Sequence, residues 1–367
     1  MHLGIDAANI RSGGGVSHLV EVLRAAQPAE AGFERVTVWA PPATLQKLPQ
    51  RPWLVALAPP LLTGSFAQRL AWQRYRLPLL CRAGCDVLFA PGGLCAGGFA
   101  PCVTMSRNML PFEPTEMERY GPSWMGLRLR MLRWLQAGSF RRADGLIFLT
   151  RYAQAAVLPQ VGSLHGLAAI IPHGVHERFL CPPRPQLPLS TYGPQRPFRL
   201  LYVSIVDVYK HQWQVVQAVA QLRAAGLPVS LDLVGPAYGP ALRQLHQAIT
   251  RYDPRGQWVR SHGEVGYGQL SSVYHAADGF VFASSCENMP NILVEAMAAG
   301  LPIACSRRGP MPEILGHAGV WFDPEQPDDI AAALTTLLED VSGRETWAWR
   351  AYEATAHYSW ERCATET

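Results

Sequence analysis

The feature that most constrains the fold of this chain is a regular alternation of short apolar runs with longer amphipathic stretches. The apolar runs are nearly continuous, which is typical of parallel strands covered by helices on both faces. We expect strands at residues 2–7, 35–40, 87–90, 101–105, 146–149 and 168–171, and again at 198–203, 229–234, 258–261, 279–283, 302–305 and 320–322. Helices are expected at residues 16–26, 213–225, 241–252, 269–276, 292–299 and 328–338. The pattern predicts an α/β protein with two doubly wound, Rossmann-like domains.

Two domains also suit the length of 367 residues, which exceeds what one hydrophobic core usually organises. The boundary is expected at residues 181–196, which contain five prolines and little apolar pattern. We therefore expect an N-terminal domain at 1–180, a C-terminal domain at 181–345, and a terminal helix at 346–367. That helix is rich in aromatic residues, so we expect it to return to the first domain for packing.

Composition and charge exclude several classes of protein. A chain with 49% hydrophobic and 16% charged residues is ordinary for a packed globular protein and unlike a disordered one. The net charge of +4 is modest, and we expect no nucleic-acid partner. The N-terminus reads as a strand instead of a signal peptide, and no apolar run is long enough to span a bilayer. We expect a cytoplasmic protein, or one held on the inner face of the cytoplasmic membrane.

The eight cysteines have no CxxC spacing, and several lie in apolar runs. We expect them to be buried thiols in a reducing compartment, with a metal-binding or disulfide pair of Cys81 and Cys85 as the alternative.

Two segments of the first half, residues 65–82 and 124–142, are basic and amphipathic. In the second segment Met, Leu and Trp alternate with Arg at helical spacing, so its helix could lie on an anionic membrane surface. The alternative is an ordinary surface helix whose apolar face packs on the sheet.

A glycine-rich turn follows the first expected strand. Gly13, Gly14 and Gly15 stand directly before the helix expected at residue 16. Glycines let the backbone approach a ligand closely, and the free amides of a helix N-terminus attract anions. The spacing matches no dinucleotide-binding or P-loop pattern, so a plain flexible turn is the alternative.

The segment at residues 284–302 carries the strongest chemical signal. Glu287 falls in the loop after the strand at 279–283, and Glu295 lies about one turn into the following helix. This places both carboxylates near the carboxyl edge of the sheet, where open α/β folds bind ligands. The free amides between them would bind an anion. A ligand rich in hydroxyls with a central diphosphate fits this arrangement.

The glutamate pair with seven intervening residues resembles the retaining glycosyltransferases of family 4, which have the GT-B fold of two Rossmann-like domains facing across a cleft. Further similarities cover nearly the whole chain and occur at residues 171–175, 200–204, 233–235, 263–265 and 312–314, and at Lys210.

The resemblance implies roles for individual residues. Glu295 would bind the nucleotide ribose, Glu287 the transferred sugar, and Lys210 the diphosphate leaving group. Val265 would lie where the backbone contacts the base. Phosphate or sugar would contact the backbone of Asn288, Met289, Pro290, Asn291 and Ile292, and Gly13, Gly14 and Gly15 would contact the donor from the other domain. A solvated surface lysine is the alternative for Lys210.

Two positions depart from the family pattern. Ser204 stands where many relatives have an arginine near the diphosphate. Arg107 and Asn108 occupy the position of a histidine near the sugar, so we consider them catalytic candidates for handling donor or acceptor. His173 is expected to be a structural residue.

The resemblance thus implies transfer of a hexose from a nucleotide diphosphate sugar to a saccharide or lipid-linked acceptor, with retention, in bacterial surface polysaccharide biosynthesis. No Asp-x-Asp sequence ends a strand, so we expect no metal and no other cofactor. The alternatives are a nucleotide-sugar epimerase or phosphorylase of similar fold, or a non-catalytic subunit that binds sugar nucleotides.

Overall fold

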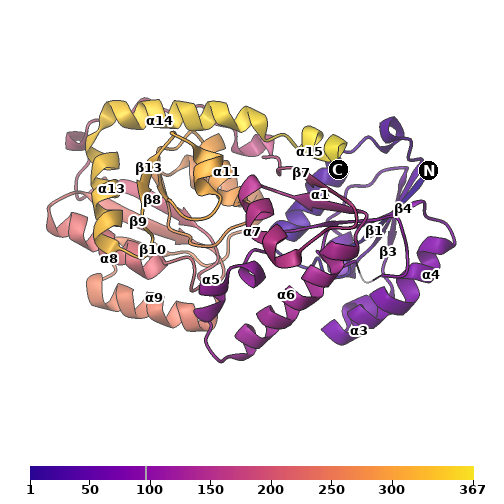
Figure 1. The fold of residues 1–367 in the computed structure, drawn as a ribbon. Coiled ribbons are helices and arrows are strands. Elements are labelled where there is room, and N and C mark those ends of the chain that lie inside the picture. Colours follow the sequence, from indigo (N-terminus) through magenta and orange to yellow (C-terminus); the bar gives the residue numbers. More distant parts are fainter. Residues whose placement is uncertain (96) are drawn as a thin grey trace. The chain divides into compact units, whose positions relative to one another are not determined.

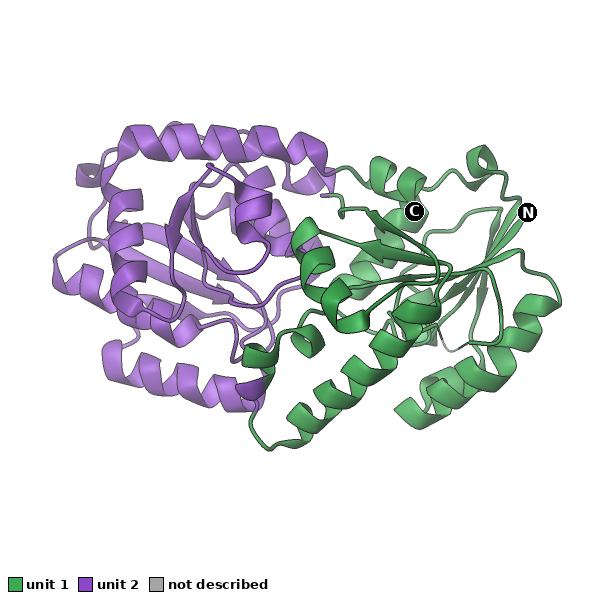
Figure 2. Cartoon of the chain, in the orientation of Figure 1, with its two compact units in different colours: residues 1–117, 121–174, 359–367 green, residues 118–120, 175–358 purple. Residues whose placement is uncertain are grey.

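The computed structural model describes residues 1–95 and 97–367. The chain forms two compact units, each built around its own parallel sheet (Figure 1, Figure 2). Unit 1 comprises residues 1–117, 121–174 and 359–367, and unit 2 comprises residues 118–120 and 175–358.

The sheet of unit 1 has seven parallel strands in the order β3-β2-β1-β4-β5-β6-β7. The strands are β1 (His2–Asp6), β2 (Arg35–Trp39), β3 (Leu54–Leu57), β4 (Val87–Ala90), β5 (Cys102–Met105), β6 (Gly145–Phe148) and β7 (Leu167–Ile170). The strand order reverses between β1 and β4, so ligands of this unit are expected at the carboxyl ends of these two strands.

Longer helices alternate with the strands of unit 1: α1 (Gly14–Ala25), α3 (Phe66–Ala71), α4 (Leu77–Arg82), α6 (Trp124–Arg142), α7 (Arg151–Val161) and α15 (Trp360–Glu366). Two shorter ones are α2 (Pro42–Leu45) and α5 (Pro114–Glu118). Ser65 caps the N-terminus of α3 in a capping box. Its side chain accepts a hydrogen bond from the backbone amide of Gln68, and the side chain of Gln68 accepts one from the backbone amide of Ser65. A π-helical turn at Trp72–Arg76 joins α3 to α4.

Unit 2 contains six parallel strands in the order β10-β9-β8-β11-β12-β13. They are β8 (Phe198–Val203), β9 (Val229–Val234), β10 (Val259–Ser261), β11 (Gly279–Phe282), β12 (Ile303–Ser306) and β13 (Val320–Phe322). Its helices are α8 (Gln212–Ala224), α9 (Gly239–Tyr252), α10 (Tyr267–His275), α11 (Asn291–Ala298), α12 (Met311–Leu315), α13 (Pro327–Glu339) and α14 (Val341–Ala354). The two doubly wound, Rossmann-like units predicted from the sequence are therefore confirmed.

Several details differ from the sequence expectations. Strand β3 was not expected, although its sequence Leu-Val-Ala-Leu is apolar; it is a short edge strand whose side chains are half-exposed or exposed. The proline-rich segment 181–196 lies inside unit 2. Instead of one terminal helix, the chain forms α14 in unit 2 and α15 in unit 1.

The expectation of eight free thiols is wrong for one pair, because Cys95 and Cys102 form a disulfide. These two residues flank the turn that leads into β5, and spacing alone did not indicate their proximity. Cys81 and Cys85 are free thiols.

Among the residues that the structure describes, no helix combines the length and apolar character needed to cross a bilayer.

Candidate active site

The strand order of unit 2 reverses between β8 and β11, whose carboxyl ends are therefore neighbours. The loop after β8 carries Ser204 and Lys210, and the loop after β11 carries Glu287. Ligands of open α/β sheets bind at such a reversal, because the loops on its two sides diverge and leave a crevice. The sheet topology thus brings together residues that are far apart in the sequence.

Lys210 and Glu287 form an ion pair at this reversal. The Lys210 side chain is only 5% exposed and that of Glu287 14%, so the pair is largely withdrawn from water. The ammonium also lies 5.1 Å from the ring centres of both Tyr209 and Phe282. Aromatic faces stabilise a desolvated cation, which explains how a lysine is accommodated here. The alternative that Lys210 is a solvated surface cation is excluded.

Ser204 is engaged in the turn that leaves β8. Its hydroxyl donates to the Ile205 carbonyl at 2.9 Å and accepts from the Gln212 amide at 2.9 Å. Gly235 follows β9 with a φ of 142°, and a Cβ there would lie 2.0 Å from the Ser204 carbonyl oxygen. Ser204 therefore lies where the loops after β8 and β9 approach each other closely. Its hydroxyl is already hydrogen-bonded within the protein.

The N-terminus of α11 faces this region without a side-chain cap. Pro290, which precedes the helix, has no N–H. It therefore cannot be one of the amide donors expected from the sequence. The Oδ1 atom of Asn291 is buried and accepts no hydrogen bond from the described residues. The first turn thus offers amide donors, and beside them an acceptor that a ligand hydroxyl could satisfy.

Glu295 lies deeper than the sequence indicated. It is 5% exposed, and the Tyr274 hydroxyl donates to its Oε2 at 3.1 Å. Burial raises the pKa of Glu295 to about 7, although the bond from Tyr274 and the charge of Arg178 both lower it. A carboxyl group with this pKa is poised near neutrality between its two protonation states.

Arg178 was not considered a site residue from the sequence. It stacks on the Tyr267 ring at 4.5 Å, and its charge acts on Glu295. Val265, expected at the base, lies half-buried in the loop between β10 and α10. The grouping of Arg178 with Tyr267 and Glu295 could be recognised only once the fold was known.

Further polar groups at this edge were also missed. His211 begins α8 in the left-handed conformation with a φ of 51°, and its Nε2 lies 2.9 Å from the Ser285 hydroxyl. Burial lowers the pKa of His211 to about 3, so its imidazole is neutral at physiological pH. The Tyr120 hydroxyl donates to Asp207 at 3.0 Å, which anchors residues 118–120 in unit 2.

Unit 1 holds the second cluster of expected site residues, at the carboxyl ends of its strands. Gly13 has a φ of 63°, and α1 begins at Gly14 without a side-chain cap. A Cβ added at Gly15 would lie 3.1 Å from Nη1 of Arg107, so the guanidinium lies directly beside the helix N-terminus. The structure thus brings the glycine turn and Arg107 together.

Arg107 carries a charge that the described residues leave without a carboxylate partner. Its Nε is buried without a hydrogen bond, and burial lowers its pKa to about 10. Since the pKa stays well above neutrality, the side chain remains cationic. Asn108 instead accepts the Leu110 amide at 3.2 Å and shapes the turn beside Arg107.

A buried polar chain lies at the carboxyl end of β1. Gln73 donates to Asp6, and Asn9 donates to Gln73 at 3.1 Å. Burial raises the pKa of Asp6 to about 6. Gln73 and the neighbouring Arg69 come from the segment expected only as a basic helix, so sequence reasoning missed their place at this edge.

His173 has a packing environment. Its Nδ1 lies 2.9 Å from Nδ1 of His18, and both rings lie 5.7 Å from the Trp360 ring. Burial holds the pKa of both histidines well below the usual value, and the Arg107 charge lowers both further.

Comparison with known proteins relates the site of unit 2 to a family. Residues 192–354 match the family described as glycosyl transferases group 1. An O-antigen chain mannosyltransferase B of Escherichia coli is 37% identical over 123 residues, which are 34% of this chain and 32% of that protein. The chain spans about a third of the length of the first curated relatives it matches.

Solved structures establish the fold of the whole chain. Sucrose-phosphate synthase from Thermosynechococcus elongatus matches with a TM-score of 0.80 and 18% identity, over 100% of this chain and 97% of that one. The Anabaena HepE protein in complex with UDP and glucose matches with a TM-score of 0.72 and 20% identity, over 100% and 98%. The predicted GT-B class is confirmed by these neighbours.

Proposed function

We propose, from the membership of residues 192–354 in the group 1 glycosyltransferases, that this chain transfers a hexose from a nucleotide diphosphate sugar to a saccharide or lipid-linked acceptor. The buried Lys210–Glu287 pair at the strand reversal of unit 2 is the observation that carries the proposal. A buried charge pair is costly to maintain for stability alone, so its position at the strand reversal favours a role in ligand binding.

Lys210 would act on the leaving group. When the bond from the sugar to the diphosphate breaks, negative charge grows on the phosphate oxygens, and a preorganised cation with helix amides stabilises it. Glu287 would exchange part of its bond to Lys210 for hydroxyls of the sugar. These groups could stabilise the leaving diphosphate without a metal ion, and we propose that the enzyme uses none.

Glu295 would bind the ribose hydroxyls, and the loop at Val265 would contact the base. Ribose hydroxyls that donate to Glu295 would stabilise its ionised form, against the burial that raises its pKa. Ligand binding would therefore bring the pKa of this group back toward its usual range.

In unit 1, the Arg107 guanidinium lies beside Gly15 at the start of α1, and no carboxylate among the described residues pairs with it. We propose that Arg107 and the amides at the start of α1 contact the donor or the acceptor. Transfer would retain configuration: the acceptor oxygen bonds to the anomeric carbon on the face that the phosphate leaves, and the acceptor proton passes to a phosphate oxygen.

Group membership and the O-antigen relative favour an acceptor in surface polysaccharide assembly, and one helix of unit 1 fits a membrane-associated acceptor. Along α6, Trp124, Leu127, Met131 and Trp134 form a stripe of exposed apolar side chains, with the two tryptophans 77% and 72% exposed. The apolar stripe therefore does not pack on the sheet, contrary to the alternative considered from the sequence.

The exposed stripe of α6 lies among basic residues. Arg128 and Arg130 are exposed and form no ion pair with the described residues. Burial lowers the pKa of Arg69 of α3, and the charges of Arg11 and Arg128 lower it further, which shows that α3 and α6 share a basic region. Exposed tryptophans with arginines suit the interface of an anionic membrane.

The function is tested by transfer assays on the purified chain. A thermal-shift screen of UDP-, GDP-, ADP- and dTDP-sugars identifies the donor, because a ligand stabilises the protein to which it binds. We then expect Glu287→Ala and the closer mimic Glu287→Gln to lower transfer roughly 100-fold or more. Glu339→Ala, on an exposed position of α13, is the matched control and should retain full activity.

Full activity in both Glu287 variants would overturn the assignment. The same assay separates the alternatives, because an epimerase would convert donor without acceptor and a non-catalytic subunit would bind donor without turnover.

A further inference from the structure

Unit 1 contains a cavity of about 380 Å³ that none of the proposed transfer residues lines. Its floor is the sheet, where the side chains of Leu3, Val36, Val87 and Val103 face it from the first or second residue of their strands. Most of these contacts come from the amino-terminal halves of the strands, although Ile5 and Phe89 also line the cavity, whereas Asp6 is the last residue of β1 and Arg107 follows β5. Its volume falls in the range typical of pockets for small molecules.

Helices form the walls of this cavity. The last turn of α1 contributes Val22 and Leu23, and its C-cap residue is Ala26. The short helix η1 (Pro28–Ala31) closes one side, and Ala364 belongs to α15. All of these elements belong to unit 1. The site therefore depends on no placement of one unit against the other.

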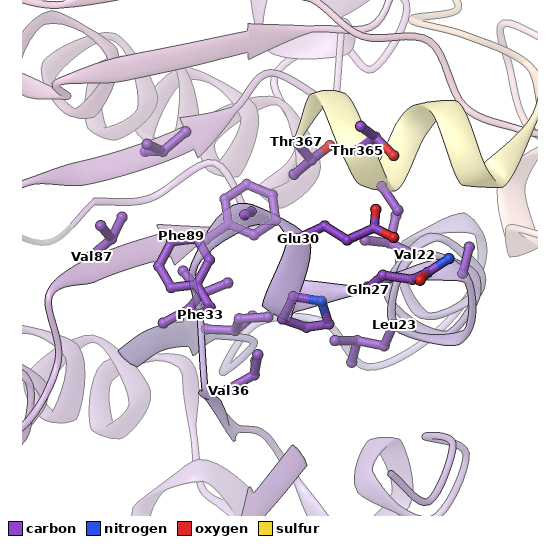
Figure 3. A pocket seen from close by; sticks show the side chains of 18 of the residues that line it. Val22, Leu23, Gln27, Glu30, Phe33, Val36, Val87, Phe89, Thr365 and Thr367 are labelled. Atoms are coloured by element: carbon purple, nitrogen blue, oxygen red, sulfur yellow. The ribbon is translucent and has the colours of Figure 1, made fainter. Parts of the chain in front are cut away.

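The lining is divided into an apolar and a polar part (Figure 3). Phe33, Phe89 and Val87 lie toward one end, while Gln27 and Glu30 lie toward the other together with Val22 and Leu23, near Thr365 of α15 and Thr367 at its C-terminal end. Glu361 of α15 also lines the cavity. A molecule that fills it would meet an apolar surface along its body and polar groups at one end.

The charge at the polar end is negative. Glu30 and Glu361 are exposed, and neither carboxylate forms an ion pair or a side-chain hydrogen bond with the described residues. The cavity lining contains no arginine or lysine. An anionic head group would therefore be repelled, and a cationic one would find two unpaired carboxylates.

We propose that this cavity binds a small amphipathic amine, with its hydrocarbon body against the sheet and its ammonium group between Glu30 and Glu361. Apolar contact would provide most of the affinity, and the carboxylates would select the head group. The site goes beyond the proposed glycosyl transfer, and its failure would leave that proposal intact. Because the first turn of α1 places Gly15 beside Arg107 and its last turn lines the cavity, an occupant would contact the same helix that borders Arg107.

The binding test uses the full chain and three ligands with one decyl chain and different head groups. Decylamine, decanol and decanoate, each below its micelle concentration, compete with the neutral fluorescent probe N-phenyl-1-naphthylamine. We expect decylamine to displace the probe best and decanoate worst, with a preference for amine over alcohol of about fivefold, as for a charge pair near the surface.

Two kinds of variant locate the ligand. Ala364→Phe and Ala26→Phe fill the cavity from different helices and should each abolish probe binding while circular dichroism and the thermal midpoint stay unchanged. The double variant Glu30→Gln/Glu361→Gln should bind decylamine no better than decanol and leave decanol binding unaltered. Glu339→Gln is the charge-matched control in unit 2 and should bind as the wild type does.

The proposal is overturned if the wild type does not bind the probe, or if decanol or decanoate competes as well as decylamine. Unchanged probe binding in both folded phenylalanine variants, or an amine preference that survives the double substitution, would also overturn it.

Discussion

At the scale of single residues, the ion pair of Lys210 with Glu287 connects the two loops of the proposed donor site. Each side chain would be costly to bury alone, so removing one partner leaves the other as an uncompensated charge. The Glu287→Gln variant is therefore the more informative of the two tested, because it keeps a hydrogen-bonding group beside Lys210. Loss of transfer in a folded Gln variant isolates the carboxylate charge from the shape of the site.

Glu295 leads to a prediction about pH. Its pKa in the folded protein is about 7, above the ordinary value of 4.5, so the folded state holds this proton more tightly than the unfolded chain. The group therefore favours folding below pH 4.5, and this contribution is lost as the pH rises toward 7. The full difference corresponds to about 3 kcal/mol.

We expect Glu295→Gln, which is neutral at every pH, to gain thermal stability relative to the wild type between pH 5 and pH 8. Differential scanning fluorimetry of both proteins across this range measures the gain, and the comparison cancels the separate contribution of Asp6. Glu339→Gln serves as the control and should follow the wild type. A constant difference between Glu295→Gln and the wild type would show that the carboxyl group is not held in its neutral form.

At the scale of elements, α6 has some apolar residues that pack within unit 1 and others that are exposed. Leu129 and Phe140 are buried in unit 1, while the stripe at Trp124, Leu127, Met131 and Trp134 is exposed. The helix is thus already attached to the protein by other residues. Its exposed stripe is available for a second partner, which we propose to be the anionic membrane.

The membrane proposal predicts the behaviour of two double variants in vesicle flotation. Arg128→Gln/Arg130→Gln should weaken binding to vesicles containing phosphatidylglycerol by about 2 kcal/mol, or roughly thirtyfold, because each basic residue contributes about 1 kcal/mol. Trp124→Ala/Trp134→Ala should also weaken binding. Trp349→Ala is the matched control, since Trp349 is 41% exposed but lies on α14 of unit 2. Equal flotation of wild type and both double variants would contradict the proposal.

The elements also show what the sequence could and could not predict. Residues 198–203 and 229–234 were predicted with the observed bounds of β8 and β9, because these buried strands are mainly apolar. β3 was not predicted although its four residues are apolar, because a run this short next to prolines does not by itself distinguish a strand from a loop. The bond between Lys210 and Glu287 joins residues 77 positions apart, and only the pairing of β8 with β11 brings them together. The burial of Glu295 likewise depends on Tyr274 from a different helix.

At the scale of the whole molecule, the chain leaves unit 1 after Gly174 and returns to it at Ser359. These two points lie against each other, since a Cβ at Gly174 would come within 2.3 Å of the Trp360 backbone nitrogen. The buried ring of Trp360 completes the contact by packing on His18 and His173. The path out of unit 1 and the path back are therefore held at one place in its core.

This arrangement predicts a strong effect from a small change. Gly174→Ala should destabilise unit 1 by about 3 kcal/mol, because the clash involves backbone that cannot rotate away. Gly84→Ala is the matched control in the same unit. A Cβ at this position would contact only His2, at 3.9 Å, so this variant should leave the stability unchanged. Thermal unfolding monitored by tryptophan fluorescence measures both variants. If Gly174→Ala unfolds at the same temperature as Gly84→Ala and the wild type, the segments at Gly174 and Trp360 are not packed as tightly as the structure shows. In that case α15 can detach without loss of the fold.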